Sequence, residues 1–314
     1  MKFTTLLTLA AAALVSAEYS QSSKHVPGIQ HVLENWNKSP LASYPTDFTR
    51  GIIPKRLHSH NDYWRDVPLY SALSVGAISV EADVWLYGDT LYIGHDTSSL
   101  TPARTFSSLY IDPIVSILEK ANPNHRFAHD TKNGVFDTSV GQTLYLWVDM
   151  KTSGPETLPA MIKALEPLRQ KGLLTTLEDG VVKQGPVTVI GTGNTPMDLV
   201  QKETKRDYFF DGPLKTLKEQ NVTKELSPIA SAQLSAVTGE VGVDGLTATQ
   251  IDAVKAVVAE ANGRGIEVRF WDLPGWPIST RNKIWLQLFE AGVYLLNVDD
   301  LEAGAGLGGI GAEW

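Results

Sequence analysis

Cysteine is absent from this chain of 314 residues. Disulfide bonds therefore cannot hold the folded protein together, and its stability must come from a hydrophobic core. Hydrophobic residues make up 43% of the sequence and charged residues 20%. These proportions suit one large globular domain or two small ones.

Basic stretches are also lacking. The chain has 27 Lys and Arg residues against 35 Asp and Glu, which gives a formal net charge of −8. Because no run or stripe of cations stands out, nucleic acid is not a predicted partner. A protein of this charge that handles phosphate needs a local cluster of cations instead of a global positive field.

Long apolar runs are confined to the first residues, MKFTTLLTLAAAALVSA. Lys2, the apolar run and the ending Val15-Ser16-Ala17 are typical of a signal peptide over residues 1–17, and predict a secreted, extracellular protein. The run is too short for a membrane-spanning helix, and no later segment is long enough. A mitochondrial presequence is the alternative, but this segment has no arginine. Glycosylation sequons begin at Asn37 and Asn221.

The rest of the chain alternates between strand-like and helix-like segments after a polar leader, residues 18–54, that we expect to pack over the domain. Strands are predicted at 56–60, 77–86, 143–150, 186–193, 207–211, 227–233, 266–273 and 292–299. Helices are predicted at 68–75, 107–121, 154–171, 196–204, 247–263 and 279–291. This order favours an α/β fold, a parallel TIM (β/α)8 barrel over residues 55–300. The glycine-rich residues 301–314 are expected to form a flexible tail.

Charged side chains gather where the strand-like runs end. In ISVEADVWL, Glu81 and Asp83 share the face opposite Ile78, Val80, Ala82 and Val84. In LYLWVDMK, Asp149 and Lys151 share a face in the same way. Because an unpaired buried charge is costly, core packing explains such strand faces poorly. A turn at Gly88-Asp89 predicts a hairpin that returns His95 toward Glu81 and Asp83.

These residue types suit phosphodiester chemistry at a divalent cation. Carboxylates of Glu81, Asp83 and Asp149 are ligands for a hard cation such as Mg²⁺ or Ca²⁺. Lys151 offers a positive charge to a phosphoryl oxygen. His60 and His95 are a candidate base and acid on either side of phosphorus.

Other interpretations start from the same residues. Each short motif taken alone is more often a solvated strand end or a surface ion pair than a site. His58 and His60 also match the first-strand ligands of a metal-dependent amidohydrolase, but that architecture needs histidines on later strands. The chain has seven histidines and none beyond His129, which excludes it. A barrel that binds phosphorylated or lipid ligands without turnover is a further alternative.

The motifs HND, E-x-D, GHD and D-x-K together resemble the phosphatidylinositol-phospholipase-C-like phosphodiesterase superfamily, in its glycerophosphodiester phosphodiesterase branch. They are also similar to sphingomyelinase D, so a sphingomyelinase D-like phospholipase stays an alternative. The segments HNDYWRDVPLYSALSVGAISVEADVWL, LYIGHD and RTFSSLYIDPI resemble most closely the fungal altered inheritance of mitochondria protein 6 family.

The resemblance implies a TIM barrel, catalytic histidines at His60 and His95, and metal ligation by Glu81, Asp83 and Asp149. Glycerophosphodiesterases usually carry His-Arg-Gly at the first strand, where this chain has His60-Asn61-Asp62. We therefore expect a secreted, metal-dependent hydrolase of phosphodiesters or phospholipids, with peripheral membrane contact, and leave its head group and oligomeric state open.

Overall fold

The computed structural model describes residues 28–36, 39, 41, 42, 44 and 46–307. The predicted signal peptide, residues 1–17, lies outside these residues, as does part of the leader. The chain divides into two units, residues 1–45 and 46–314, and helix α2 (Gly28–Asn35) belongs to the first. Within the described residues, no helix has the length and apolar character needed to cross a bilayer.

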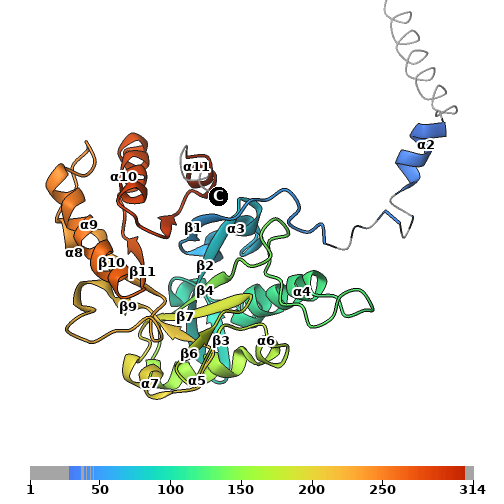
Figure 1. Cartoon of the computed structure of the whole chain (residues 1–314), viewed down its shortest axis with the longest axis horizontal. Coiled ribbons are helices and arrows are strands. Elements are labelled where there is room, and N and C mark those ends of the chain that lie inside the picture. Colours follow the sequence, from blue (N-terminus) through green and yellow to red (C-terminus); the bar gives the residue numbers. More distant parts are fainter. Residues whose placement is uncertain (1–27, 37–38, 40, 43, 45, 308–314) are drawn as a thin grey trace, which may run out of the picture. The chain divides into compact units, whose positions relative to one another are not determined.

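The second unit is a mixed α/β domain built on a mostly parallel sheet (Figure 1). The strands of the main sheet, in spatial order, are β12 (Leu296–Val298), β1 (Lys55–Ser59), β2 (Ala77–Tyr87), β4 (Leu144–Met150), β7 (Val187–Gly193) and β8 (Phe209–Phe210). Along this order every pairing is parallel. All eight predicted strands overlap observed ones, six in this sheet and two in the sheet described next.

A second parallel sheet contains β11 (Glu267–Trp271), β10 (Ile229–Gln233) and β9 (Gly212–Pro213). Hydrogen bonds join the two sheets beside β11, and at the other end the chain itself passes from β8 to β9. The amide of Asp211, between β8 and β9, donates to the Gly191 carbonyl at 2.9 Å. On the other side, the amides of Tyr294 and Leu295 donate to the Val268 carbonyl at 3.0 and 3.2 Å. Hydrogen bonds thus link the predicted strands in order from 227–233 through 292–299 and 56–60 to 207–211.

Two antiparallel hairpins extend the sheets. β3 (Thr90–Ile93) returns along β2, with Val84 opposite Ile93, so the predicted turn at Gly88-Asp89 is confirmed. The other hairpin, β5 (Thr176–Glu178) with β6 (Val181–Lys183), was not expected from the sequence. Its second strand is fully exposed, so it carries no alternation between buried and exposed residues that would mark it.

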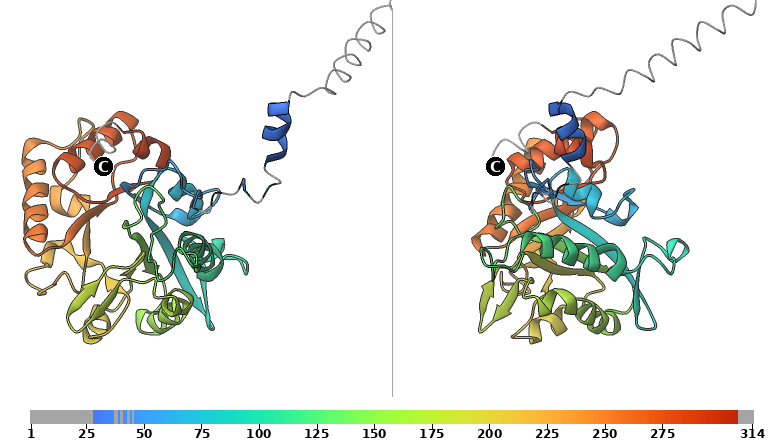
Figure 2. Two further views of the ribbon diagram at one scale, coloured as in Figure 1. Left: turned by 45° about the vertical axis from the view of Figure 1, so that its right-hand side comes forward. Right: turned by 90° about the vertical axis from the view of Figure 1, so that its right-hand side faces the viewer.

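Helices lie outside the strands, as the views in Figure 2 show. α5 contacts β2 and β4, α9 contacts β11, and α11 contacts β1. The longer helices are α4 (Asp112–Ala121), α5 (Gly154–Ala164), α9 (Ala248–Gly263) and α10 (Ile278–Glu290). The shorter ones are α3 (Tyr70–Ser74), α6 (Glu166–Gln170), α7 (Met197–Lys202), α8 (Leu234–Thr238) and α11 (Leu301–Ala305), with a π-helix at Ser107–Ile111 and 3-10 turns at Asp62–Trp64, Thr97–Ser99 and Leu214–Thr216.

Local chemistry explains several of these boundaries. α9 begins with a capping box, in which the Thr247 hydroxyl accepts from the Gln250 amide and the Gln250 side chain accepts from the Thr247 amide. The predicted helix 154–171 is instead two helices, interrupted at Leu165. Pro167 lies two residues after the break, in the first turn of the second helix. Because proline has no amide hydrogen, it cannot donate the backbone hydrogen bond that a continuous helix would need at this position.

Two boundary predictions needed correction. The expected flexible tail begins as helix α11, because Asp300 caps it through the Ala303 amide and its Leu301 side chain is buried. The leader was expected to end at residue 54, but residues 46–54 already belong to the α/β unit. There Thr49 is buried and its hydroxyl donates to the Val135 carbonyl at 2.8 Å.

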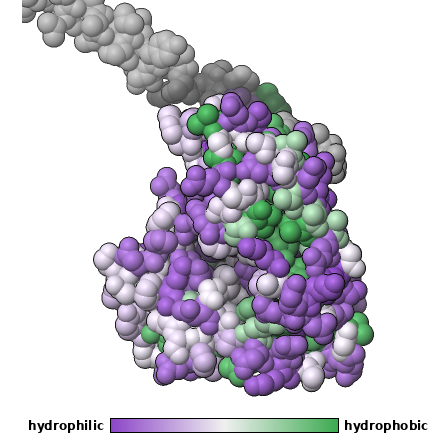
Figure 3. All heavy atoms as spheres, turned by 90° about the vertical axis from the view of Figure 1, so that its left-hand side faces the viewer, coloured by the Kyte–Doolittle hydropathy of each residue, from purple (hydrophilic) through white to green (hydrophobic). Residues whose placement is uncertain are grey.

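The core lies between the strands and their helices and includes Trp147, Phe106, Phe136 and Phe270 among its largest buried side chains. In β2 the first eight residues are all buried, on both faces. Parallel strands covered on both faces require this. The face of the protein drawn in Figure 3 is mainly hydrophilic, with hydrophobic residues gathered beside a hollow.

Candidate active site

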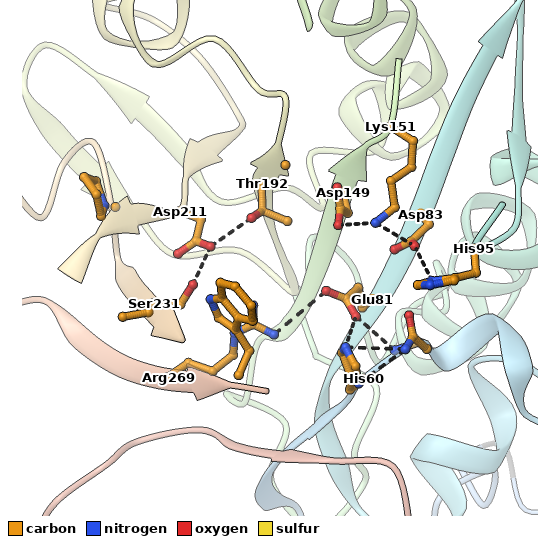
Figure 4. Close-up of a pocket in the computed structure, with 16 residues that line it drawn as sticks. His60, Glu81, Asp83, His95, Asp149, Lys151, Thr192, Asp211, Ser231 and Arg269 are labelled. Atoms are coloured by element: carbon orange, nitrogen blue, oxygen red, sulfur yellow. Dashed lines mark hydrogen bonds and ion pairs between the residues drawn. The ribbon is translucent and has the colours of Figure 1, made fainter. Parts of the chain in front are cut away.

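The carboxyl ends of neighbouring strands bring the predicted acidic residues together (Figure 4). Asp83 on β2 is paired directly with Asp149 on β4, and Glu81 lies one pleat earlier on β2. One carboxylate oxygen from each of Glu81, Asp83 and Asp149 lies within 4.8 Å of the other two. The i, i+2 spacing read from the sequence therefore places all three side chains on one side of the sheet.

This acidic cluster fits a divalent cation. Burial, followed by the charges of Glu81 and Asp149, raises the pKa of Asp83 to about 7. Oδ1 of Asp83 is buried and has no hydrogen-bond donor within the described part of the chain. A cation would relieve both the repulsion and the unpaired oxygen, and carboxylate oxygens are the ligands that Mg²⁺ and Ca²⁺ prefer.

Lys151 lies between two of these carboxylates. Its Nζ is 2.9 Å from Asp83 Oδ2 and 2.7 Å from Asp149 Oδ2, and Figure 4 shows the ammonium bridging the pair. Burial opposes the charged form, but the two carboxylates raise the pKa of Lys151 above its ordinary value. The side chain therefore carries a positive charge at the edge of the acidic cluster, as the D-x-K spacing predicts.

His60 follows β1 and is partly exposed. Its Nδ1 lies 2.8 Å from Asp299 Oδ1, and its Nε2 lies 3.8 Å from Glu81 Oε2. Burial works to lower the pKa of His60, but the hydrogen bond to Asp299 and the charge of Glu81 outweigh it and raise that pKa. A carboxylate behind an imidazole fixes its orientation and strengthens it as a base.

His95 follows the β2–β3 hairpin and reaches the same site. Its Nδ1 lies 3.5 Å from Asp83 Oδ2 and 3.2 Å from the Tyr63 hydroxyl. The Tyr63 hydroxyl also donates to Asp83 Oδ2 at 2.6 Å. The indole ring of Trp64 lies 5.1 Å from the imidazole. Half of the His95 side chain is exposed (51%), so one face of the ring is open to a ligand.

His58 has a different environment, although it is only two residues from His60. It is fully buried, with Nδ1 2.7 Å from Ser79 Oγ and Nε2 2.7 Å from Arg269 Nη1. Because arginine only donates, Nε2 must be the unprotonated acceptor. Burial and then the charge of Arg269 lower the pKa of His58 to about 3. His58 is thus a neutral core histidine, in agreement with exclusion of the amidohydrolase interpretation.

The remaining described histidines do not join the site. His125 bonds within its own loop, and His129 Nδ1 lies 3.4 Å from the exposed carboxylate of Asp130. His31 lies in α2, outside the α/β unit.

The predicted site residues surround one cavity of about 500 Å³. All six, His60, Glu81, Asp83, His95, Asp149 and Lys151, line it. The opposite wall contains residues that the sequence did not single out: Thr192, Asp211, Ser231 and Arg269. Asp211 Oδ2 accepts from Thr192 at 2.9 Å and from Ser231 at 2.6 Å. Burial raises the pKa of Asp211.

Comparisons with known proteins show which family the chain resembles. The model of the AIM6-like phosphodiesterase domain matches residues 46–211. An altered inheritance of mitochondria protein 6 homolog from Arthroderma benhamiae is 48% identical over 309 residues, covering 95% of this chain and 98% of the relative. Altered inheritance of mitochondria protein 6 from Eremothecium gossypii is 34% identical, covering 92% and 80%. The Saccharomyces cerevisiae protein is 31% identical, covering 83% and 73%.

The chain belongs to the altered inheritance of mitochondria protein 6 family. The resemblance inferred from the HND, E-x-D, GHD and D-x-K motifs is thereby confirmed, and the domain is phosphodiesterase-like.

In this family member, part of the cavity comes from beyond the matched segment. Ser231 and Arg269, which line the cavity, follow residue 211, and so does Asp299, which contacts His60. Some of these residues carried a signal that could have been read. Asp299 ends the strand-like run GVYLLNVD just as Asp149 follows LYLWV, and Arg269 is a charged residue inside the apolar run IEVRFW. Both patterns place a polar side chain at a strand position that core packing disfavours.

Proposed function

We propose that the protein is a metal-dependent phosphoric diester hydrolase acting on phosphodiesters of lipids or lipid-derived alcohols. The observation that carries the proposal is the convergence of Glu81, Asp83 and Asp149 with His60 and His95 on one cavity. A non-catalytic binding site would need charge but not two imidazoles beside an acidic cluster. The phosphodiesterase-like family of the chain agrees with this chemistry.

In the proposed reaction, a hydroxyl of the substrate attacks the neighbouring phosphorus. One imidazole of the His60 and His95 pair removes the hydroxyl proton. The other donates a proton to the oxygen of the leaving alcohol as its bond to phosphorus breaks. The products are the free alcohol and a cyclic phosphate, which is released or opened by water. Lys151 offsets negative charge on a phosphoryl oxygen.

Glu81, Asp83 and Asp149 would hold the cation, for which we propose Mg²⁺ or Ca²⁺. When bound, a divalent cation supplies positive charge to the phosphoryl oxygens. Asp299 would orient His60, and Tyr63 would hold the carboxylate of Asp83 through its 2.6 Å hydrogen bond.

We also propose that the linked strands form a closed (β/α)8 barrel. Support comes from the hydrogen bonds that join β11 to the chain entering β12, and from the bond of Asp211, between β8 and β9, to β7. A closed parallel barrel gathers the carboxyl ends of all its strands around one mouth, where such enzymes place their active sites. The acidic residues occupy that end of β2 and β4.

Export from the cell and peripheral membrane contact are part of the same proposal. They are supported by Val15-Ser16-Ala17 after an apolar run and by the lipid-derived substrates proposed. Terminal sequencing of native protein checks export. A mature N-terminus at Glu18 agrees with it, and an intact Met1 in a cellular fraction contradicts it.

The activity is tested with the full chain stripped of metal by chelation. Mg²⁺ or Ca²⁺ is restored, and turnover is measured on glycerophosphodiesters, lysophospholipids and sphingomyelin. We expect hydrolysis of at least one class that requires the cation and is lost in Asp83→Ala. His125→Ala, an exposed loop histidine outside the cavity, is the control. Metal binding without turnover of any phosphodiester would instead support a binding barrel.

A further inference from the structure

A buried guanidinium on β11 forms part of the cavity wall. Arg269 is 3% exposed, yet it lines the cavity. Its position is fixed by neighbours on three sides. The Trp147 ring lies 4.2 Å from the guanidinium carbon, and Nη1 donates to Asn297 Oδ1 at 2.9 Å and to His58 Nε2 at 2.7 Å.

The positive charge of Arg269 has no hydrogen-bonded anion. Its two acceptors, Asn297 and the neutral His58, carry no charge. Among the described residues only Glu81 brings a carboxylate oxygen within 4 Å, and its 3.9 Å separation is too long for a hydrogen bond. Burying a cation is costly unless an anion pairs with it.

Donor capacity is also left over. Nη1 makes both hydrogen bonds of the guanidinium, whereas Nε is buried without a partner within the described part of the chain. Nη2 likewise donates no hydrogen bond to any described residue. Arg269 therefore combines a fixed orientation, a charge that no anion hydrogen-bonds and free N–H groups beside a cavity. These properties match an anion, and guanidinium N–H groups fit phosphoryl oxygens well.

We propose that Arg269 binds a non-bridging phosphoryl oxygen of the substrate from the β11 side of the cavity. Trp147 and Asn297 then act as positioning residues that aim the guanidinium. The inference rests on the proposed function, because it takes the anion to be the phosphoryl group of a phosphodiester.

Binding of inorganic phosphate to the Mg²⁺-loaded full chain tests this without turnover. In Arg269→Gln we expect phosphate to bind at least about 10-fold more weakly, the usual effect of losing a hydrogen bond to a charged group. Mg²⁺ affinity should change by no more than a few-fold. Arg269→Lys keeps a charge but not the planar fork, so it should restore only part of the phosphate affinity.

A matched control is Arg206→Lys. Arg206 is also buried, but its guanidinium donates to the backbone carbonyls of Glu203, Tyr208 and Glu225, away from this cavity. It should lose stability without losing phosphate affinity. Unchanged phosphate affinity in both Arg269 variants would overturn the inference. A loss of Mg²⁺ affinity alone would also overturn it, because it would indicate that Arg269 has a purely structural role.

If neither Arg269 variant folds, NMR signals of the arginine side-chain Nε–H groups in the wild-type chain test the inference. Phosphate binding should shift the Nε–H signal of the buried Arg269. The absence of a shift at saturating phosphate would contradict the inference.

Two outcomes separate this inference from the proposed function. If the wild-type chain binds phosphate through Arg269 but hydrolyses no phosphodiester, the proposed function is wrong and the anion site remains. If the Arg269 variants hydrolyse phosphodiesters as fast as the wild-type chain, the proposed function holds and the inference about Arg269 is wrong.

Discussion

Nδ1 of His60 lies 2.8 Å from Oδ1 of Asp299, although 239 positions separate the two residues in the chain. Pairing of β1 with β12 creates this contact, since Ser59 is opposite Val298. The site therefore depends on strands from both ends of the α/β unit.

Replacing Asp299 by Asn should weaken His60 as a base. The change removes the charge that raises the pKa of His60, so that pKa falls. We expect the limb of the pH–rate profile set by His60 to move to lower pH. The rate at neutral pH should fall by about 10–100-fold, as when the carboxylate behind a functional imidazole is removed. Asp130→Asn alters a comparable pair with His129 outside the cavity and should leave the profile unchanged.

Gly193→Ala should disturb the acidic cluster. Gly193 has φ +63°, and a Cβ there would overlap Asp149 Oδ1. We expect Asp149 to be displaced and the affinity for Mg²⁺ or Ca²⁺ to fall at least about 10-fold, because one carboxylate ligand is misplaced.

Gly88→Ala controls for the backbone in this experiment. Gly88 has nearly the same φ, +59°, but no atom lies within 4 Å of its added Cβ. Both variants carry the left-handed strain, about 1–2 kcal/mol. Only Gly193→Ala should change calorimetric metal titrations. Equal metal affinity in the two variants would show that Asp149 does not bind the cation.

Metal binding should release a proton. The pKa of Asp83 is raised to about 7 without a cation, so below pH 7 this carboxyl is largely protonated and must ionise to act as a ligand. The metal affinity should rise with pH up to about 7 and then level off. Calorimetry in buffers of different ionisation enthalpy measures the released proton.

Tyr63→Phe provides a directional check on that linkage. The Tyr63 hydroxyl donates to Asp83 and lowers its pKa, so removing it should move the rise in metal affinity to higher pH. A pH-independent affinity between pH 5 and 8 would contradict the assignment of Asp83 as a ligand.

His60→Ala and His95→Ala should each lower turnover by about 10²–10⁴-fold, the usual contribution of a positioned proton-transfer group. Metal affinity should change far less, because neither histidine belongs to the acidic cluster. If both serve one proton relay, the double variant should be little slower than the slower single variant. Steady-state kinetics of the three variants measure this, and full activity of His60→Ala would make that residue structural.

Much of the fold and six of the residues that line the cavity could be predicted from sequence because they follow local rules. Successive side chains of a strand point to opposite faces. Along the strand-like runs at 77–86 and 143–150 this alternation is enough to put Glu81 on the same strand face as Asp83, and Asp149 on the same face as Lys151. Asp299 and Arg269 act through partners more than 200 positions away, which no local pattern reveals. The break at Leu165 depends on one proline, and helix α11 depends on one capping residue. The spacing of hydrophobic residues does not reveal features that depend on a single residue.

The pairing of β1 with β12 also has a consequence for how the protein is made. A ribosome synthesises Glu81, Asp83 and Asp149 well before it reaches Asp299. A chain that is incomplete, or clipped before β12, can collect the carboxylates yet lacks the partner of His60. We therefore expect a fragment that ends before β12 to be at least as slow as the Asp299→Asn variant.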